Sequence, residues 1–146
     1  MRIRAVAAAV ALLVTGCGSA EPTNPLARTS WQLVSIESMA PDESPSVAIG
    51  EPAAYTVSFG EDGRAVFRVD CNRGNSSWLI EPSAPDSGGL RFGPIALTRM
   101  FCPQPSFDTQ VAAALGRVRG YLLSDGRLHL SLEADSGVMH WRPQPS

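Results

Sequence analysis

The sequence contains no lysine, so arginine supplies all twelve of its basic residues. These arginines are spread along the chain, and fourteen acidic residues leave a formal net charge of −2. Because binding to a nucleic-acid backbone requires a concentrated basic surface, we expect no nucleic acid among the partners of this protein. Apolar residues make up 44% of the 146 positions and charged residues 18%, a balance that is typical of one globular domain and argues against general disorder.

Motifs that carry chemistry are also scarce. The sequence has no C-x-x-C pair of the thioredoxin type and no G-x-S-x-G nucleophile element. Its only histidines, His129 and His140, are not accompanied by further metal ligands at a fixed spacing, so they are expected to be exposed residues of a sheet. We therefore predict no metal site, no cofactor and no enzymatic activity.

A hydrophobic run long enough to span a bilayer is missing as well. The apolar run Ala5–Val14 has about ten residues and follows Arg2 and Arg4, which is the pattern of an export signal. Residues 13–17 read Leu-Val-Thr-Gly-Cys. This ending resembles the lipobox, at which a bacterial signal peptide is cut before a diacylated cysteine.

We accordingly predict three segments along the chain. Residues 1–16 would be a lipoprotein signal peptide and residues 28–143 the folded domain. Residues 17–27 would be a lipidated N-terminus and a flexible tether, because this polar stretch holds two prolines and shows no apolar period. A diacylglyceryl group on Cys17 would anchor the protein to the extracytoplasmic face of a bacterial membrane. The alternative is a plain secretory signal followed by a chance cysteine.

The apolar pattern predicts an α+β fold that is dominated by an antiparallel, strongly curved or barrel-like sheet. Apolar residues at helical spacing predict one α-helix over 107–118, packed on the sheet, with Ser106 as its N-cap. The segments 39–54 and 81–89 carry many Pro, Ser and Gly residues and are expected to be loops. Strands are expected where apolar and polar residues alternate: 29–36, 55–59, 65–71, 76–80, 90–92, 128–132 and 138–142, with 95–98 as a further candidate.

The C-terminal hairpin also allows a prediction of register. A four-residue turn over 134–137 would place Leu130 opposite Trp141 on the core side. His129 and His140 would then share the outer face, in diagonal positions across the hairpin.

Two cysteines, Cys71 and Cys102, remain once Cys17 is assigned to the anchor. Alternation places Cys71 on the apolar face of its strand, so its thiol is expected to point inward. In an exported protein such a pair usually closes as a disulfide, and a loop of about thirty residues would contribute roughly 3.5 kcal/mol to stability. The alternative is that Cys71 is a nucleophile activated by a histidine and by Arg73, although no spacing places a histidine there.

Several short motifs follow one another in a familiar order. They are Trp-Gln-Leu at 31–33, Cys-Asn-Arg at 71–73, Thr-Arg-Met-Phe-Cys at 98–102, the helix that starts near Phe107, and Leu-His-Leu at 128–130. This order resembles the META domain, the family that includes the HslJ-type heat-shock lipoproteins. Asp70 stands where that family commonly has glycine.

The resemblance implies an envelope or secreted domain that is associated with stress and drug tolerance and has no established enzymatic activity. It also places Asn72, Arg73, Thr98 and Arg99 near the cysteine pair as candidate binding residues. The alternative is that Asn72 and Thr98 only satisfy the backbone of a turn, while the arginines face solvent.

The sequence thus predicts a lipid-anchored envelope protein that acts by binding or by structural support. A small-ligand carrier or inhibitor is a second hypothesis, because small curved sheets often hold ligands at their mouths. An envelope enzyme that uses Cys71 is a third. Trp31, Trp78 and Trp141 are expected to fill the core rather than to line a pocket.

Overall fold

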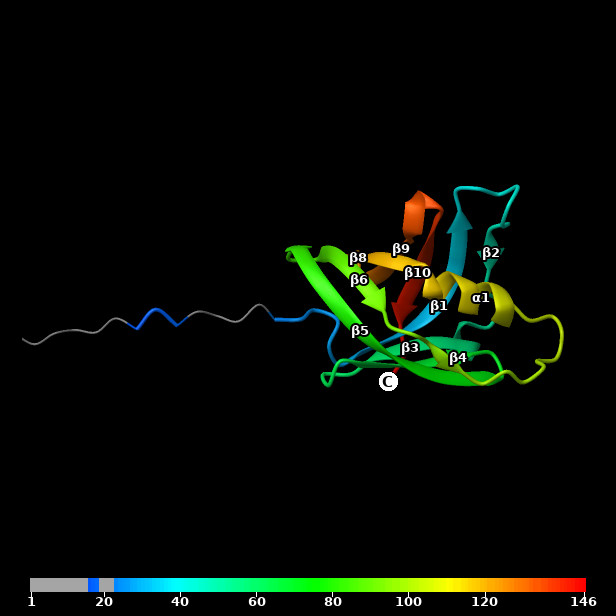
Figure 1. Ribbon diagram of the computed structural model, residues 1–146, viewed down its shortest axis with the longest axis horizontal. Coiled ribbons are helices and arrows are strands. Elements are labelled where there is room, and N and C mark those ends of the chain that lie inside the picture. Colours follow the sequence, from blue (N-terminus) through cyan, green and yellow to red (C-terminus); the bar gives the residue numbers. More distant parts are fainter. Residues whose placement is uncertain (1–15, 19–22) are drawn as a thin grey trace, which may run out of the picture.

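The computed structural model describes residues 16–18 and 23–146 of the chain (Figure 1). The predicted signal peptide therefore lies almost entirely outside the described residues, and so does part of the predicted tether. The described residues form ten strands, one α-helix and two 3-10 helices: β1 (Thr29–Ser38), β2 (Val47–Ala48), η1 (Pro52–Ala54), β3 (Tyr55–Phe59), β4 (Arg64–Val69), β5 (Asn72–Ala84), β6 (Ser87–Phe92), β7 (Ala96–Leu97), α1 (Asp108–Gly116), β8 (Val118–Ser124), β9 (Arg127–Leu132), η2 (Glu133–Asp135) and β10 (Gly137–Pro143).

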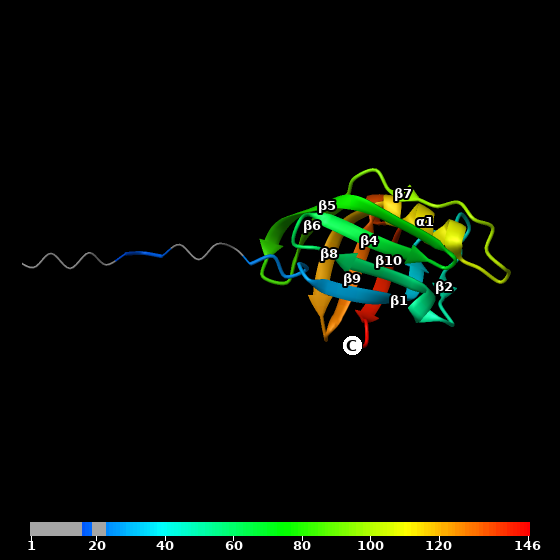
Figure 2. The same cartoon turned by 90° about the horizontal axis from the view of Figure 1, so that it is seen from below.

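Eight of these strands close into an antiparallel barrel. Around the barrel the order is β1, β3, β4, β5, β6, β8, β9 and β10, and the pairing of β10 with β1 completes the ring. The short strands β2 and β7 pair with β1 and β5 outside this ring. Closure leaves none of the eight ring strands at a free edge. Figure 2 shows the strands wrapping around a common interior, which confirms the predicted barrel-like antiparallel sheet.

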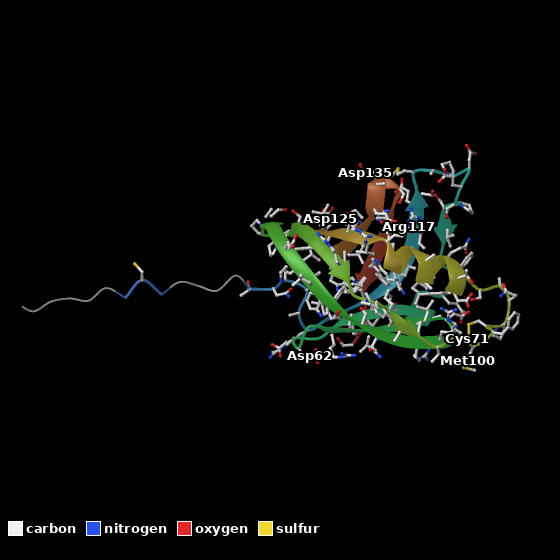
Figure 3. All side chains as sticks on the ribbon, viewed as in Figure 1. Asp62, Cys71, Met100, Arg117, Asp125 and Asp135 are labelled. Carbon is white, nitrogen blue, oxygen red and sulfur yellow. A yellow bond between two sulfur atoms is a disulfide. The ribbon has the colours of Figure 1, made fainter. Side chains whose placement is uncertain are left out.

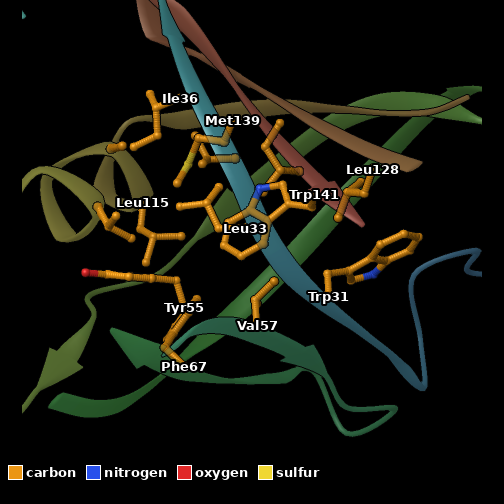
Figure 4. Packing of buried hydrophobic residues seen from close by; sticks show 14 of the residues in the cluster. Trp31, Leu33, Ile36, Tyr55, Val57, Phe67, Leu115, Leu128, Met139 and Trp141 are labelled. Carbon is orange, nitrogen blue, oxygen red and sulfur yellow. The ribbon is translucent and has the colours of Figure 1, made fainter. Parts of the chain in front are cut away.

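The interior of the barrel is packed with apolar side chains. In β3, for example, Tyr55, Val57 and Phe59 are buried while the two residues between them are not. Figure 4 shows Trp141 and Met139 in the middle of this cluster, and both are fully buried. The other two tryptophans are each 7% exposed, so the prediction that all three fill the core is confirmed.

The helix α1 lies at the end of the barrel where β3 begins and β4 ends (Figure 1). It buries Val111, Ala114 and Leu115, three of the residues whose spacing predicted it. The predicted N-cap is wrong by one residue: the helix begins at Asp108, and Ser106 Oγ only accepts a hydrogen bond from the Asp108 amide at 3.2 Å. The cap position belongs to Phe107, whose amide donates instead to the Tyr55 hydroxyl at 2.9 Å.

The predicted loop over 81–89 is wrong, because all but Pro85 and Asp86 of these residues belong to two paired strands. β5 continues to Ala84, with a register shift after Pro82, and β6 begins at Ser87. A Cβ atom at Gly88 would lie 2.4 Å from the carbonyl oxygen of Glu81. The glycine therefore allows the close approach of the two strands and does not mark a loop.

The C-terminal hairpin differs from its predicted register by two residues. Trp141 lies opposite Leu128, and His140 lies directly opposite His129. The reason is that the turn occupies residues 133–136, one position earlier than predicted, with Ala134 in the left-handed region at φ 54°. An even shift leaves each side chain on its predicted face of the sheet.

The long segment 39–54 contains more regular structure than the predicted surface loop. Val47 and Ala48 form β2 against β1, and residues 52–54 form η1. Val47 and Ile49 are each 7% exposed, so this segment contributes to the core as well as to the surface.

Candidate functional site

The disulfide between Cys71 and Cys102 joins two separate segments at one end of the barrel, and it confirms the predicted pairing. Cys71 lies in the two-residue turn between β4 and β5, and Cys102 lies in the segment between β7 and α1. The prediction that Cys71 points inward is wrong, since it is only half-buried, whereas Cys102 is 2% exposed. Strand alternation ends at Val69, because Asp70 turns the chain with a φ of 56°.

Asn72 connects the turn to the segment that carries Cys102. Its side chain is 3% exposed, and its Nδ2 donates to the carbonyl oxygen of Met100 at 3.2 Å and to the sulfur of Cys102 at 3.4 Å. Its Oδ1 accepts from the Met100 amide at 2.7 Å and from the Thr98 hydroxyl at 2.9 Å. A single buried amide thus fixes both backbone groups of Met100.

The other candidate residues from the sequence lie around this amide. The Arg73 amide donates to Thr98 Oγ1 at 3.0 Å, and the Thr98 amide donates back to the Arg73 carbonyl at 2.9 Å. The exposed Arg73 guanidinium donates to the backbone carbonyls of Asp70 and Asn72. Arg99 is exposed. The structure therefore brings Asn72, Arg73 and Thr98 into one network beside the disulfide, with Arg99 at its rim. We use the name disulfide corner for the Cys71–Cys102 disulfide together with Asn72, Arg73, Thr98, Arg99, Met100 and Phe101.

The disulfide corner presents two large apolar side chains to solvent. Met100 is 64% exposed and Phe101 is 85% exposed, and Figure 3 shows Met100 beside Cys71 at the outer end of the barrel. Phe101 lies between two anchor points, because Asn72 holds Met100 and the disulfide holds Cys102. An exposed aromatic side chain on a segment fixed in this way is a favourable contact for a partner, since binding need not order the segment first.

A pocket of about 380 Å³ lies between this segment and the start of α1. Its lining combines the apolar surfaces of Ile95 and Leu97 with polar groups from Asn72, Thr98 and Asp108. The approach of β7 that forms one wall depends on Gly74, where a Cβ atom would lie 2.4 Å from the carbonyl oxygen of Ala96. Sequence analysis did not find Asp108 or Gly74 as parts of this site, because both depend on how the 95–107 segment folds back onto β5.

A second polar group lies on the outer face of β9 and β10. The Nδ1 atoms of His129 and His140 are 2.8 Å apart, and the Nε2 atom of His140 lies 3.1 Å from a carboxylate oxygen of Glu37. Burial lowers the pKa of His129 below its ordinary value, and the neighbouring His140 and Arg127 lower it further. These surroundings therefore favour the neutral form of His129. The sequence missed this contact because the hairpin register was predicted two residues away.

Comparisons with known proteins agree with this architecture. A protein from Burkholderia xenovorans, solved by NMR, matches with a TM-score of 0.65 and 21% identity, over 90% of this chain and 96% of that chain. A DUF4847 family protein from Bacteroides vulgatus, solved by crystallography, matches with a TM-score of 0.57 and 13% identity, over 81% and 94% of the two chains. No curated protein matches the chain. At these identities the two structures establish the fold alone.

The fold and the corner define a small closed β-barrel with one helix at its end and one disulfide across its rim. The model of the META domain family matches residues 24–145, and the chain belongs to this family. Within residues 16–18 and 23–146, the helix α1 is too short to cross a bilayer, and no other helix there is long enough either.

Proposed function

We propose that this protein is a lipid-anchored envelope protein of a bacterium, and that it acts by binding a partner at the disulfide corner rather than by catalysis. Its META domain would face the extracytoplasmic space, attached through Cys17, which is exposed in the structure. The resemblance to the HslJ-type lipoproteins supports a role in envelope stress or drug tolerance.

One observation carries this proposal: a fixed segment exposes Phe101 almost completely. Four hydrogen bonds from one buried amide and a covalent link hold a surface segment whose outermost side chain is aromatic. Such a segment needs a physical reason, since exposing a large apolar group to water is unfavourable by about 25 cal/mol per Å². A protein or peptide that covers Phe101 would recover this free energy.

The state of Cys71 supports a binding role over thiol chemistry. Its sulfur is bonded to Cys102, so it is not available as a thiolate nucleophile in the oxidised protein. The two histidines contact each other and Glu37 instead of a sulfur atom.

A small-ligand carrier is the second candidate, and the 380 Å³ pocket beside the corner favours it over an inhibitor. The interior of the barrel is filled by side chains such as Phe67 and Trp141, so a ligand would bind in this outer pocket and not inside the barrel. Its mixed lining suits a small molecule with one apolar face and one hydrogen-bonding edge.

Photocrosslinking in intact cells tests the proposal. The full chain would carry p-benzoylphenylalanine in place of Phe101 or, as a matched control, in place of Leu79, which is 65% exposed on β5. Leu79 lies seven residues from Asn72 along the same strand, about 23 Å away. We expect a discrete crosslinked product from position 101 that is absent from position 79 and is lost when Cys71 and Cys102 are both serine. Equal labelling at both positions, or none at 101, would refute binding at the corner.

The crosslinking variant at position 101 and a second variant with a fluorescent probe separate the two candidates. If position 101 gives no protein adduct, but a panel of envelope ligands changes the fluorescence of a probe attached near Thr109 at the pocket wall, the carrier function replaces the partner-binding function. Silence in both assays would leave structural support as the role of the domain.

A further inference from the structure

The observed register places the two histidines of the chain face to face. His129 and His140 are the only histidines among the 146 residues, and they are directly opposite in the β9–β10 hairpin. Both side chains line an open groove of about 540 Å³ on the outside of the barrel, with Ser131 and Val138 nearby. The two imidazole rings are therefore in contact with each other beside an open groove.

When His140 is neutral, the contact with Glu37 determines which of its ring nitrogens carries the proton. An ionised carboxylate only accepts hydrogen bonds, so the Nε2 of His140 must donate to Glu37 across the observed 3.1 Å. The Nδ1 of a neutral His140 is then an unprotonated acceptor, and the 2.8 Å contact requires the Nδ1 of His129 to be the donor. Glu37 thus aims a free lone pair of His140 at its partner ring, which is the arrangement that orients histidine ligands in metal sites.

Although the sequence alone predicts no metal site, we propose that His129 and His140 form a site for a divalent transition-metal ion, which their Nδ1 atoms bind, with Cu²⁺ as the preferred ion. Two cis nitrogen ligands at about 2.0 Å from a square-planar metal are about 2.8 Å apart. The two Nδ1 atoms already have this separation. The rings need only turn so that both lone pairs meet at one point, and the His140 side chain is 25% exposed.

Metal binding at this site requires no net gain or loss of protons by the two histidines. Binding removes the hydrogen bond between the two Nδ1 atoms, and the proton of His129 moves through solvent to its own Nε2. Both imidazoles stay neutral, and the ion keeps its charge. No third group of the described residues joins the pair, since within them no cluster of three His, Cys, Asp or Glu side chains could hold a metal. Water from the groove or an external ligand would fill the other positions, so the site is open to exchange.

A copper titration of the full chain tests this site. The protein would carry Cys17→Ser, because the free thiol of Cys17 binds and reduces copper, and it would be purified without a histidine tag. Glycine-buffered Cu²⁺ would be titrated by calorimetry, and the bound ion would be examined by electron paramagnetic resonance. Because the chain has two histidines, any imidazole nitrogen coupling in the spectrum comes from this pair.

We expect one Cu²⁺ per chain with coupling to two imidazole nitrogens, and weaker binding of Ni²⁺ and Zn²⁺. His129→Gln and His140→Gln should each weaken Cu²⁺ binding by about tenfold or more, and Glu37→Gln by about 10- to 100-fold. Glu61→Gln, an exposed acid that pairs with Arg28, is the matched control and should leave the affinity unchanged.

Three results would overturn the proposal. They are the absence of saturable binding, a spectrum without imidazole coupling, and affinities that the histidine variants leave as they were. Glu37→Gln keeps the test decisive if a histidine variant unfolds, because Glu37 is 57% exposed and its replacement removes no core packing.

Discussion

Replacing Asn72 with alanine tests how the disulfide corner is held together. The substitution removes a side chain that is 3% exposed and makes two contacts through Nδ2 and two through Oδ1. Three of these contacts are hydrogen bonds to nitrogen or oxygen, and each contributes about 1 kcal/mol net. All three are only partly buried, so water replaces some of what is lost. The expected decrease in the free energy of unfolding is therefore about 2–3 kcal/mol.

Urea unfolding followed by tryptophan fluorescence gives this quantity, because all three tryptophans are buried in the barrel. For a domain of this size the loss corresponds to a decrease of roughly 8–12 °C in Tm. Asn75→Ala is the matched control, since Asn75 is an exposed residue on the same strand that accepts one hydrogen bond from Arg64. It should change stability by less than about 0.5 kcal/mol. A loss below about 1 kcal/mol for Asn72→Ala would refute the account of the corner.

The disulfide allows a second, independent check of the same reasoning. When Cys71 and Cys102 are both serine, the 98–102 segment has lost its covalent anchor. Asn72→Ala should then cost less than it does in the oxidised protein, with an interaction energy of about 0.5 kcal/mol or more. If the two changes in the free energy of unfolding add strictly, the Asn72 amide and the disulfide stabilise the protein independently of each other.

Three further predictions concern stability. Reduction of the Cys71–Cys102 disulfide, which spans 31 residues, should lower the free energy of unfolding by about 3.5 kcal/mol, and equal urea midpoints with and without reductant would contradict this. Gly74→Ala should cost about 1–3 kcal/mol by urea unfolding, because its Cβ atom meets the β7 backbone, whereas Gly50→Ala has open space and should cost less than about 0.5 kcal/mol; equal effects would exclude steric contact as the cause. Tyr121→Phe should leave Tm unchanged or raise it, since the buried Tyr121 hydroxyl has no hydrogen-bond partner among the described residues, and a marked decrease would reveal a partner such as bound water.

The strands that alternate cleanly were predictable from the sequence, because one face of each packs against the filled interior. β3 follows its predicted pattern position by position, and β4 does so as far as Val69, where the strand ends two residues earlier than predicted. β8 was missed, although Asp125 and Gly126, both with positive φ, form the kind of two-residue turn that joins two strands. The helical spacing that ends at Val118 concealed this strand, since Val118 is buried as the first residue of β8 and not as part of α1.

The sequence predicted which residues belong to the candidate site better than it predicted how they are arranged. The expectation that the chain is exported, together with its even pair of remaining cysteines, predicted the disulfide, and the family resemblance placed Asn72 and Thr98 near it. That Asn72 binds both backbone groups of Met100 depends on the path of a segment without regular structure, and no local pattern determines that path. The contact between His129 and His140 was not predicted, because a shift of the turn by one residue moves the pairing of the two strands by two residues.

The central claim is that this chain is an exported, lipid-anchored domain in which Cys71 and Cys102 form a disulfide. One mass measurement tests each part of this claim. Protein extracted from the membranes of the cells that make it would be weighed intact, before and after reduction, together with a count of thiols that react in the native state. We predict a chain that begins at a diacylated Cys17, shows no reactive thiol, and gains the mass of two hydrogens on reduction. A chain that keeps residues 1–16, or a Cys71 thiol that reacts at neutral pH without reductant, would contradict the account.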